Sequence, residues 1–128
     1  MLDHIGFAVN EYDRSKRFYE MVLAPLSITL LMEVTPEQTG LGSHAGFGSN
    51  GKPFFWIGNQ GQPATGVHVA FTAQSRAAVD EFYRAALEVG GRDNGAPGIR
   101  SHYHEYYYGA FVLDPDGNNI EAVCHKPE

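Results

Sequence analysis

The two halves of this chain are approximate copies of each other. At an offset of 64 positions the same residue types recur: His4, Phe7, Phe18, Tyr19 and Leu23 match His68, Phe71, Phe82, Tyr83 and Leu87. A repeat of this size indicates a duplicated supersecondary unit, although two copies are too few for a solenoid. We therefore expect one domain, residues 1–128, built from two similar modules at about residues 1–60 and 66–126.

Composition excludes several classes of partner. The chain is 43% hydrophobic and 19% charged, which is ordinary for a globular protein. A formal net charge of −6 argues against sequence-independent binding of nucleic acid, which requires clustered lysine and arginine. The most apolar run, residues 24–34, is too short to cross a membrane, and no targeting signal is evident. With Cys124 as the only cysteine, nothing indicates an oxidising compartment, and we expect a cytoplasmic protein without nucleic-acid or membrane partners.

Each module begins with a strand in which bulky and small side chains alternate. The bulky face suits packing against helices, and the opposite face carries a histidine among small residues. These small-residue faces hold His4, Gly6 and Ala8 in the first module, and His68, Ala70 and Thr72 in the second. Such a face leaves room for a ligand beside each histidine.

A helix follows each of these strands. Asp13 can cap a helix over about residues 14–23, and Ser75 can cap one over about residues 76–89. Three β-prone segments come next in each half, so each module reads strand, helix, strand, strand, strand. Two such modules side by side predict an α+β fold: an eight-stranded, strongly curved mixed sheet with helices outside and a concavity inside.

Glu121 is the unusual residue of the last strand. A Pro/Asp/Gly turn at residues 114–118 predicts a hairpin, and Glu121 then lies among apolar residues. Strand alternation places Ile120 and Ala122 on one face and Glu121 on the other. Burying a carboxylate there is costly unless a base, a set of donors or a metal compensates it. Its equivalent in the first module is Phe55, or Trp56 if the alignment shifts by one residue, and neither can bind a metal.

Two histidines and one carboxylate can form a metal site. If the modules pack about a pseudo-twofold axis, the inner faces that carry His4, His68 and Glu121 converge. Such a set suits Fe(II), Mn(II) or Zn(II) and leaves coordination positions open to substrate. The alternative is that each histidine is a hydrogen-bonded structural residue, or that Glu121 simply pairs with one of them in a metal-free protein.

Residues 101–108 are rich in tyrosine and histidine. They can supply a general acid or base, with Tyr106 and His104 as the candidates, or an aromatic wall for a pocket. The alternative is a tyrosine-rich edge strand or a dimer contact. If strand alternation holds, Tyr106 and Tyr108 share one face and Tyr107 the other, and which face points inward is open.

The chain resembles the vicinal oxygen chelate superfamily, which includes glyoxalase I, extradiol dioxygenases, fosfomycin-resistance proteins and bleomycin-resistance proteins. The resemblance rests on Asp3-His4-Ile5, on Gly66-Val67-His68-Val69 with the later Phe82-Tyr83, and on the run from Asp114 to Glu121. It implies paired βαβββ modules, an active site in the concave sheet and a homodimer.

The same resemblance implies that His4, His68 and Glu121 are metal ligands. Glyoxalase I carries a Glu or Gln where this chain has Phe55 or Trp56, so only three protein ligands remain. That pattern fits the dioxygenases and the fosfomycin-resistance enzymes better. The latter need a cationic pocket, and no basic cluster is evident in this sequence.

The function expected is that of a metal-dependent lyase or dioxygenase. A bound Fe, Mn, Zn or Ni ion would be chelated by two adjacent oxygens of a small substrate, with Glu121, Tyr106 and His104 as catalytic residues. One alternative is a metal-free protein that binds or sequesters a drug-like or aromatic compound. Another is a structural module without a small-molecule site.

Overall fold

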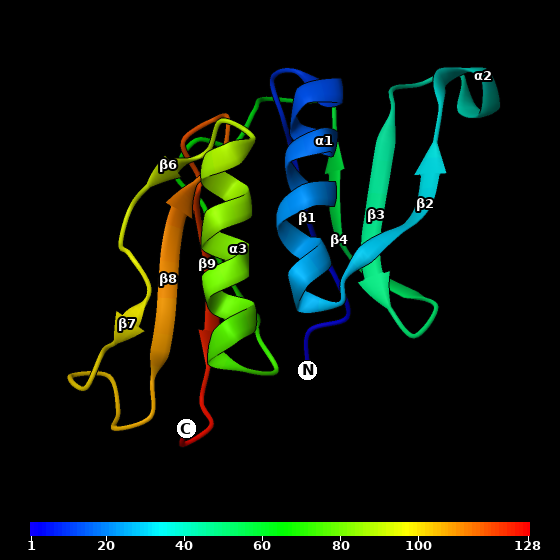
Figure 1. The fold of residues 1–128 in the computed structure, drawn as a ribbon. Coiled ribbons are helices and arrows are strands. Elements are labelled where there is room, and N and C mark those ends of the chain that lie inside the picture. Colours follow the sequence, from blue (N-terminus) through cyan, green and yellow to red (C-terminus); the bar gives the residue numbers. More distant parts are fainter.

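A computed structural model describes residues 1–128, apart from the side chain of Thr39, and contains two similar halves (Figure 1). The first half consists of β1 (Ile5–Ala8), α1 (Tyr12–Leu23), β2 (Thr29–Val34), β3 (His44–Ser49) and β4 (Lys52–Gly58), with the short helices η1 (Ala24–Leu26) and α2 (Pro36–Thr39). The second consists of β5 (His68–Thr72), α3 (Arg76–Glu88), β6 (Arg92–Asp93), β7 (Gly98–Ile99), β8 (Tyr108–Leu113) and β9 (Asn119–Cys124). The predicted pair of βαβββ modules is confirmed.

The strands form two mixed sheets rather than one sheet of eight strands. Their orders are β1-β4-β3-β2 and β5-β9-β8-β6, with β7 paired to β8. In each sheet the first strand of the module runs parallel to the last, and the other pairs are antiparallel. The glycine-rich segment 90–98 supports only the short strands β6 and β7, which raises the number of strands to nine.

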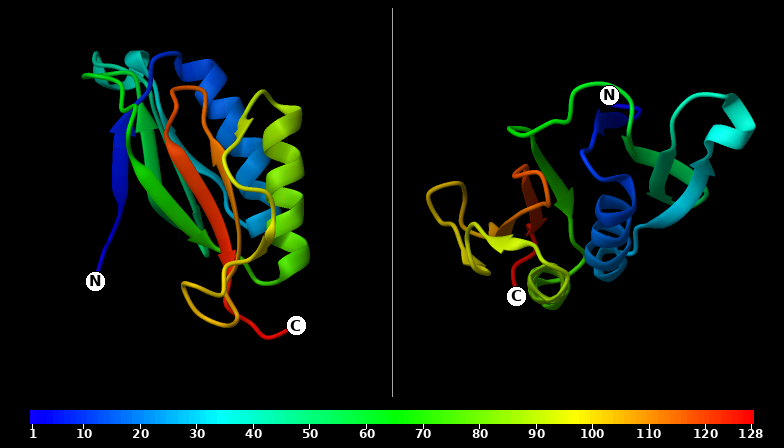
Figure 2. Two further views of the ribbon diagram at one scale, coloured as in Figure 1. Left: turned by 90° about the vertical axis from the view of Figure 1, so that its left-hand side faces the viewer. Right: turned by 90° about the horizontal axis from the view of Figure 1, so that it is seen from above.

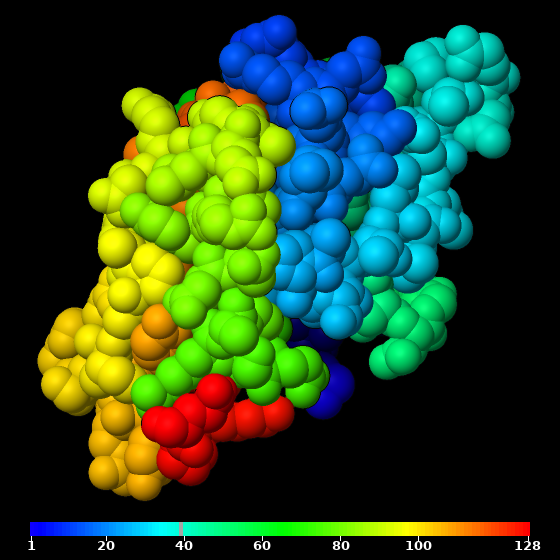
Figure 3. All heavy atoms as spheres, in the orientation of Figure 1, coloured from blue at the N-terminus to red at the C-terminus, as the bar shows by residue number. Residues whose placement is uncertain are grey.

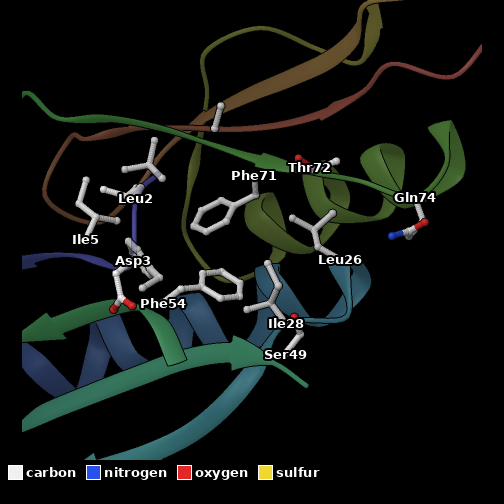
Figure 4. Close-up of a pocket in the computed structure, with 13 residues that line it drawn as sticks. Leu2, Asp3, Ile5, Leu26, Ile28, Ser49, Phe54, Phe71, Thr72 and Gln74 are labelled. Atoms are coloured by element: carbon white, nitrogen blue, oxygen red, sulfur yellow. The ribbon is translucent and has the colours of Figure 1, made fainter. Parts of the chain in front are cut away.

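The seam between the modules holds a cavity of about 410 Å³ with a mixed polar and apolar lining. Figure 4 shows the rings of Phe54 and Phe71 on opposite sides of it, with Leu26 and Ile28 closing one end. Ile5 of β1 also lines this cavity. The opening strands of the two modules therefore stand beside a shared space instead of joining both sheets into one.

Both long helices cover the same side of the sheets. Figures 1 and 2 show α1 and α3 next to each other on one side, and Figure 3 shows how they fill that face. Aromatic side chains form the contact beneath them: Tyr19 of α1 lies 4.9 Å from Phe55, which lies 5.2 Å from Phe71, between ring centroids. Among the described residues, no helix is long and apolar enough to span a membrane. Neither long helix covers the opposite side, which we term the helix-free face.

The two helices begin differently. Ser75 caps α3 as predicted, because its hydroxyl accepts a hydrogen bond from the backbone N–H of Ala78 at 3.1 Å. The predicted cap at Asp13 is wrong: α1 begins at Tyr12, its N-cap is Glu11, and no side chain caps it. Asp13 instead lies in the first turn, where a carboxylate interacts favourably with the helix dipole.

Replacement of Ser75 with alanine should therefore lower the free energy of unfolding by about 1 kcal/mol, since an N–H of the first turn loses its acceptor. Urea denaturation measures this loss. Ser101→Ala, at an exposed turn, is the matched control and should change stability by less than about 0.5 kcal/mol. Equal losses in the two variants would contradict the capping role.

The predicted turn between β8 and β9 contains a buried carboxylate. Asp114 is 1% exposed, and its Oδ1 accepts the backbone N–H groups of Asp116 and Asn118, each at 2.9 Å. Its Oδ2 accepts the buried hydroxyl of Tyr19 at 2.5 Å. Burial, followed by the charge of Asp114, raises the pKa of Tyr19, so this hydroxyl keeps its proton. The turn of the second module is thereby fastened to the helix of the first.

Asn118 connects the same turn to the segment between the modules. Its amide nitrogen donates to the carbonyl of Ala64 at 2.8 Å, and its amide oxygen accepts the N–H of Val67 at 2.9 Å. Val67 immediately precedes β5, the neighbour of β9. Asn118 therefore aligns the strand that carries His68 with the strand that carries Glu121.

Candidate functional site

Glu121 projects from the middle of β9 onto the helix-free face. Its neighbours Ile120 and Ala122 point the other way into the core, as the predicted alternation requires. Across the sheet, Glu121 is paired with Ala70 of β5 and with Phe111 of β8. The carboxylate is flanked on both sides, which explains why only 2% of the residue is exposed.

Two side chains compensate this buried carboxylate. Nε2 of His68 lies 2.9 Å from Oε1, and the hydroxyl of Tyr107 donates to Oε2. Because a carboxylate only accepts, Nε2 of His68 carries a proton in this arrangement. Burial, together with the bond to Glu121, raises the pKa of Tyr107, so its hydroxyl stays a donor at neutral pH.

An open cavity of about 540 Å³ lies over this group. Six residues line it: the ionisable or hydroxyl-bearing side chains of His68, His102, Tyr103, Tyr107 and Glu121, and the ring of Phe111. Phe111 lies beside His68, with ring centroids 6.2 Å apart, and Tyr103 packs edge-on against Tyr107 at 4.8 Å. More than half of the side chain of His68 is exposed, so a ligand in the cavity can reach its ring.

His4 does not join this group within one chain. Its Nδ1 bonds to Oδ1 of Asp3 at 2.7 Å, and its side chain is 59% exposed. Among the described residues, no set of three His, Cys, Asp or Glu side chains is arranged to hold a metal ion. One chain thus brings together two of the three predicted ligands, and the role of His4 stays a prediction.

The tyrosine that reaches Glu121 is Tyr107 rather than Tyr106. Tyr106 is 40% exposed, and its backbone N–H bonds to Nδ1 of His104. His104 also pairs with His125: Nε2 of His104 lies 2.6 Å from Nδ1 of His125. By alternation along β8, Tyr107 lies on the same face as Phe111. The pairing of Phe111 with Glu121 shows that this face, and not that of Tyr106, meets the carboxylate. The catalytic roles of Tyr106 and His104 stay predictions.

In the first module, the position of Glu121 is occupied by Trp56. Gly6 of β1 pairs with Trp56 of β4, just as Ala70 pairs with Glu121. The preferred alignment with Phe55 is therefore wrong by one residue. The cause is a β-bulge in the pairing of β3 with β4, where Phe54 is an extra residue in β4.

Comparison with known proteins agrees with this architecture. Residues 1–122 match the family model of the Glyoxalase/Bleomycin resistance protein/Dioxygenase superfamily. A solved structure of a glyoxalase/bleomycin resistance protein from Albidiferax ferrireducens T118 is 31% identical in sequence, with a TM-score of 0.81. That match covers 97% of this chain and 98% of the other. Curated proteins gave no match.

More distant solved structures share the fold. Glyoxalase I from Zea mays is 18% identical, with a TM-score of 0.70 over 99% of this chain and 45% of its own. A mutant of the fosfomycin resistance protein FosX from Listeria monocytogenes, complexed with Mn(II) and 1S,2S-dihydroxypropylphosphonic acid, is 19% identical, with a TM-score of 0.68 over 96% of this chain and 90% of its own. Family match, module order and sheet pairing agree, and the chain belongs to the Glyoxalase/Bleomycin resistance protein/Dioxygenase superfamily.

Proposed function

We propose that this protein is a metal-dependent enzyme of its superfamily that acts on a small substrate with two adjacent oxygens. The observation that carries the proposal is the Glu121 carboxylate, 2% exposed on an apolar strand and 2.9 Å from an accessible histidine at an open cavity. A buried carboxylate whose ionisable partner faces a ligand-sized cavity is an arrangement typical of functional sites.

The donors fit a divalent cation. His68 offers an imidazole nitrogen and Glu121 a carboxylate oxygen, the ligand types that suit Fe(II), Mn(II), Zn(II) and Ni(II). The Mn(II) in the FosX complex supports this choice. When bound, such an ion supplies Lewis acidity that stabilises an enolate-like or catecholate-like anion of the substrate.

His4 would complete the site from a second copy of the chain. It occupies the repeat-equivalent position of His68 but lies apart from Glu121 within one chain. A twofold homodimer that places the first module of each subunit over the second module of its partner brings His4 to both sites at once. We therefore propose a homodimer with two shared sites.

Residues of the chain also control the protons of the site. The hydroxyl of Tyr107 donates a hydrogen bond to Oε2 of Glu121. This bond orients the carboxylate so that Oε1 faces His68. Tyr106 and His104 remain the proposed proton carriers. Neither lines the cavity, but the ring of His104 lies 5.6 Å from that of Tyr107, which does. Glu121 is also a proposed catalytic residue: Oε1, which faces His68 at the cavity, would accept or return a substrate proton when it does not hold the metal.

Mixing two inactive variants tests the shared site. His4→Ala and His68→Ala homodimers should each lose metal binding. After unfolding and refolding as a mixture, about a quarter of the sites should again be complete, because half of the dimers combine both variants and hold one intact site. Mn(II) binding, measured by electron paramagnetic resonance, should recover to that level. No recovery, with dimers confirmed by light scattering, would reject sharing of the site.

A metal-free binding protein is the second candidate. The aromatic walls of the 540 Å³ cavity favour it, since planar compounds bind well between such rings. His68→Ala separates the two candidates: a binder keeps its affinity for the ligand, whereas an enzyme loses metal and turnover together. The cavities of both modules argue against a structural module without a small-molecule site.

A further inference from the structure

We infer that Trp56 and His44 form an aromatic floor on the helix-free face of the first module, and that this floor stacks on a planar, conjugated part of the ligand. The inference rests on the proposed function and narrows its substrate class. It assigns a role to Trp56 at the position where the second module carries Glu121.

The indole of Trp56 lies flat on the sheet. Trp56 pairs with Gly46 across β3 and β4, and a β-carbon added to Gly46 would lie 2.8, 2.8 and 2.9 Å from Cη2, Cζ2 and Cζ3 of the indole. Nearly equal distances to three adjacent ring carbons mean that the ring presents its face to Gly46. Only glycine leaves space for this orientation, which explains a residue that otherwise weakens a strand interior.

His44 lies on the same face of the sheet and also covers a glycine. It pairs with Gly58 across the same two strands, and a β-carbon added to Gly58 would collide with Cδ2 and Nε2 of the imidazole. Both rings therefore cover glycine backbone. A cavity of about 240 Å³ lies over them, and Gly6, Trp56, His44 and Gln60 all line it.

The two modules offer different surfaces at equivalent positions. In the second module Phe111 stands opposite Glu121, and in the first Gly46 stands opposite Trp56. One face supplies a carboxylate and the other a broad π surface without a formal charge. Flat rings stack face to face in an offset manner, and a saturated ring cannot approach as closely. In a shared site, the floor of one subunit would face His68 and Glu121 of the other.

An aromatic ring over a strand glycine also stabilises a sheet without any ligand. That structural role predicts a loss of stability when Trp56 is replaced, and no discrimination between planar and saturated ligands. Ligand preference is therefore the informative measurement.

Trp56 is the only tryptophan, so the fluorescence of the protein reports on the floor directly. The probes are benzohydroxamate and cyclohexanecarbohydroxamate, which carry the same pair of chelating oxygens on a planar or a saturated ring. In metal-free, EDTA-treated protein, benzohydroxamate should quench the tryptophan emission and bind about two- to tenfold more tightly than its saturated analogue. In Mn(II)-loaded protein, both should bind more tightly, with the same preference.

Variants separate ligand binding from folding. Trp56→Leu should remove the preference, measured by calorimetry, and leave the affinity for the saturated probe unchanged. Trp56→Phe keeps an aromatic face and should retain most of the preference. If Trp56→Leu does not fold, the emission of Trp56 in the wild-type protein decides the matter: quenching by benzohydroxamate supports the floor, and unchanged emission on binding overturns it.

The two proposals fail in different ways. Equal affinity for both hydroxamates in the wild-type protein, with or without Mn(II), overturns the aromatic floor even if Mn(II) binds. A clear preference in metal-free protein that Trp56→Leu removes supports the floor, and failure of the same wild-type protein to bind Mn(II) rejects the metal site. Unchanged preference in Trp56→Leu also overturns the floor.

Discussion

Replacing Glu121 with glutamine should lower the affinity for Mn(II) more than about 100-fold, because loss of a ligand exceeds the 10- to 100-fold effect typical of supporting residues. Glutamine has the same shape as glutamate but no charge, so the packing of β9 should survive. Its amide can still form hydrogen bonds with His68 and Tyr107. The free energy of unfolding should therefore stay equal or rise, since a buried charge is removed. Calorimetric Mn(II) titration and urea denaturation of the same preparation measure both quantities.

Glu20→Gln is the matched control for this experiment. Glu20 is exposed on α1, away from the site, so the same change there should leave Mn(II) affinity within about twofold of the wild type. A Glu121→Gln protein that binds Mn(II) normally but unfolds more easily would show that Glu121 is a structural partner of His68. That result would move the function to the metal-free binder.

Asp114→Ala should lower the free energy of unfolding by about 3 kcal/mol, the largest stability effect that we expect for a single polar substitution here. The carboxylate is 1% exposed and accepts two backbone N–H groups together with the hydroxyl of Tyr19. Alanine leaves these buried donors without an acceptor, and water has little access to replace it. Urea denaturation followed by circular dichroism gives the change.

Two variants locate the origin of that loss. Tyr19→Phe removes only the hydroxyl and should cost about 1 kcal/mol. Asp116→Ala changes a carboxylate in the same turn that accepts the N–H of Asn10 at the surface, and should cost less than about 1 kcal/mol. If Asp114→Ala and Asp116→Ala destabilise equally, burial of the Asp114 carboxylate is not the cause.

Patterns within single segments were sufficient for much of the fold. The repeat of His4 and His68 predicted duplicated modules, and the alternation around Glu121 predicted its isolation on the face opposite the core. The cap at Ser75 followed from residue type and position alone. The alternation and the cap depend on neighbours within a few residues, where strand and helix periodicity act directly.

Registers between strands were harder to predict. The bulge at Phe54 moves Trp56 onto the helix-free face, and a bulge leaves little trace in the sequence. A shift of one residue exchanges the two faces of a strand. This single irregularity therefore decides that Phe55 packs in the core and that Trp56 lies on the helix-free face. The choice between Tyr106 and Tyr107 was undecided for the same reason.

The repeat and the alternation of the sequence by themselves determined which residues face away from the helices. These are His68 and Glu121 in the second module, and the face of His4, Gly6 and Ala8 in the first. Tertiary structure decided which of them meet. Parallel pairing of β5 with β9, held by Asn118, brings His68 to Glu121, whereas β1 and β5 belong to separate sheets beside a common cavity. Side-chain direction is set locally by backbone geometry, but distance between strands is set by packing that no local pattern contains.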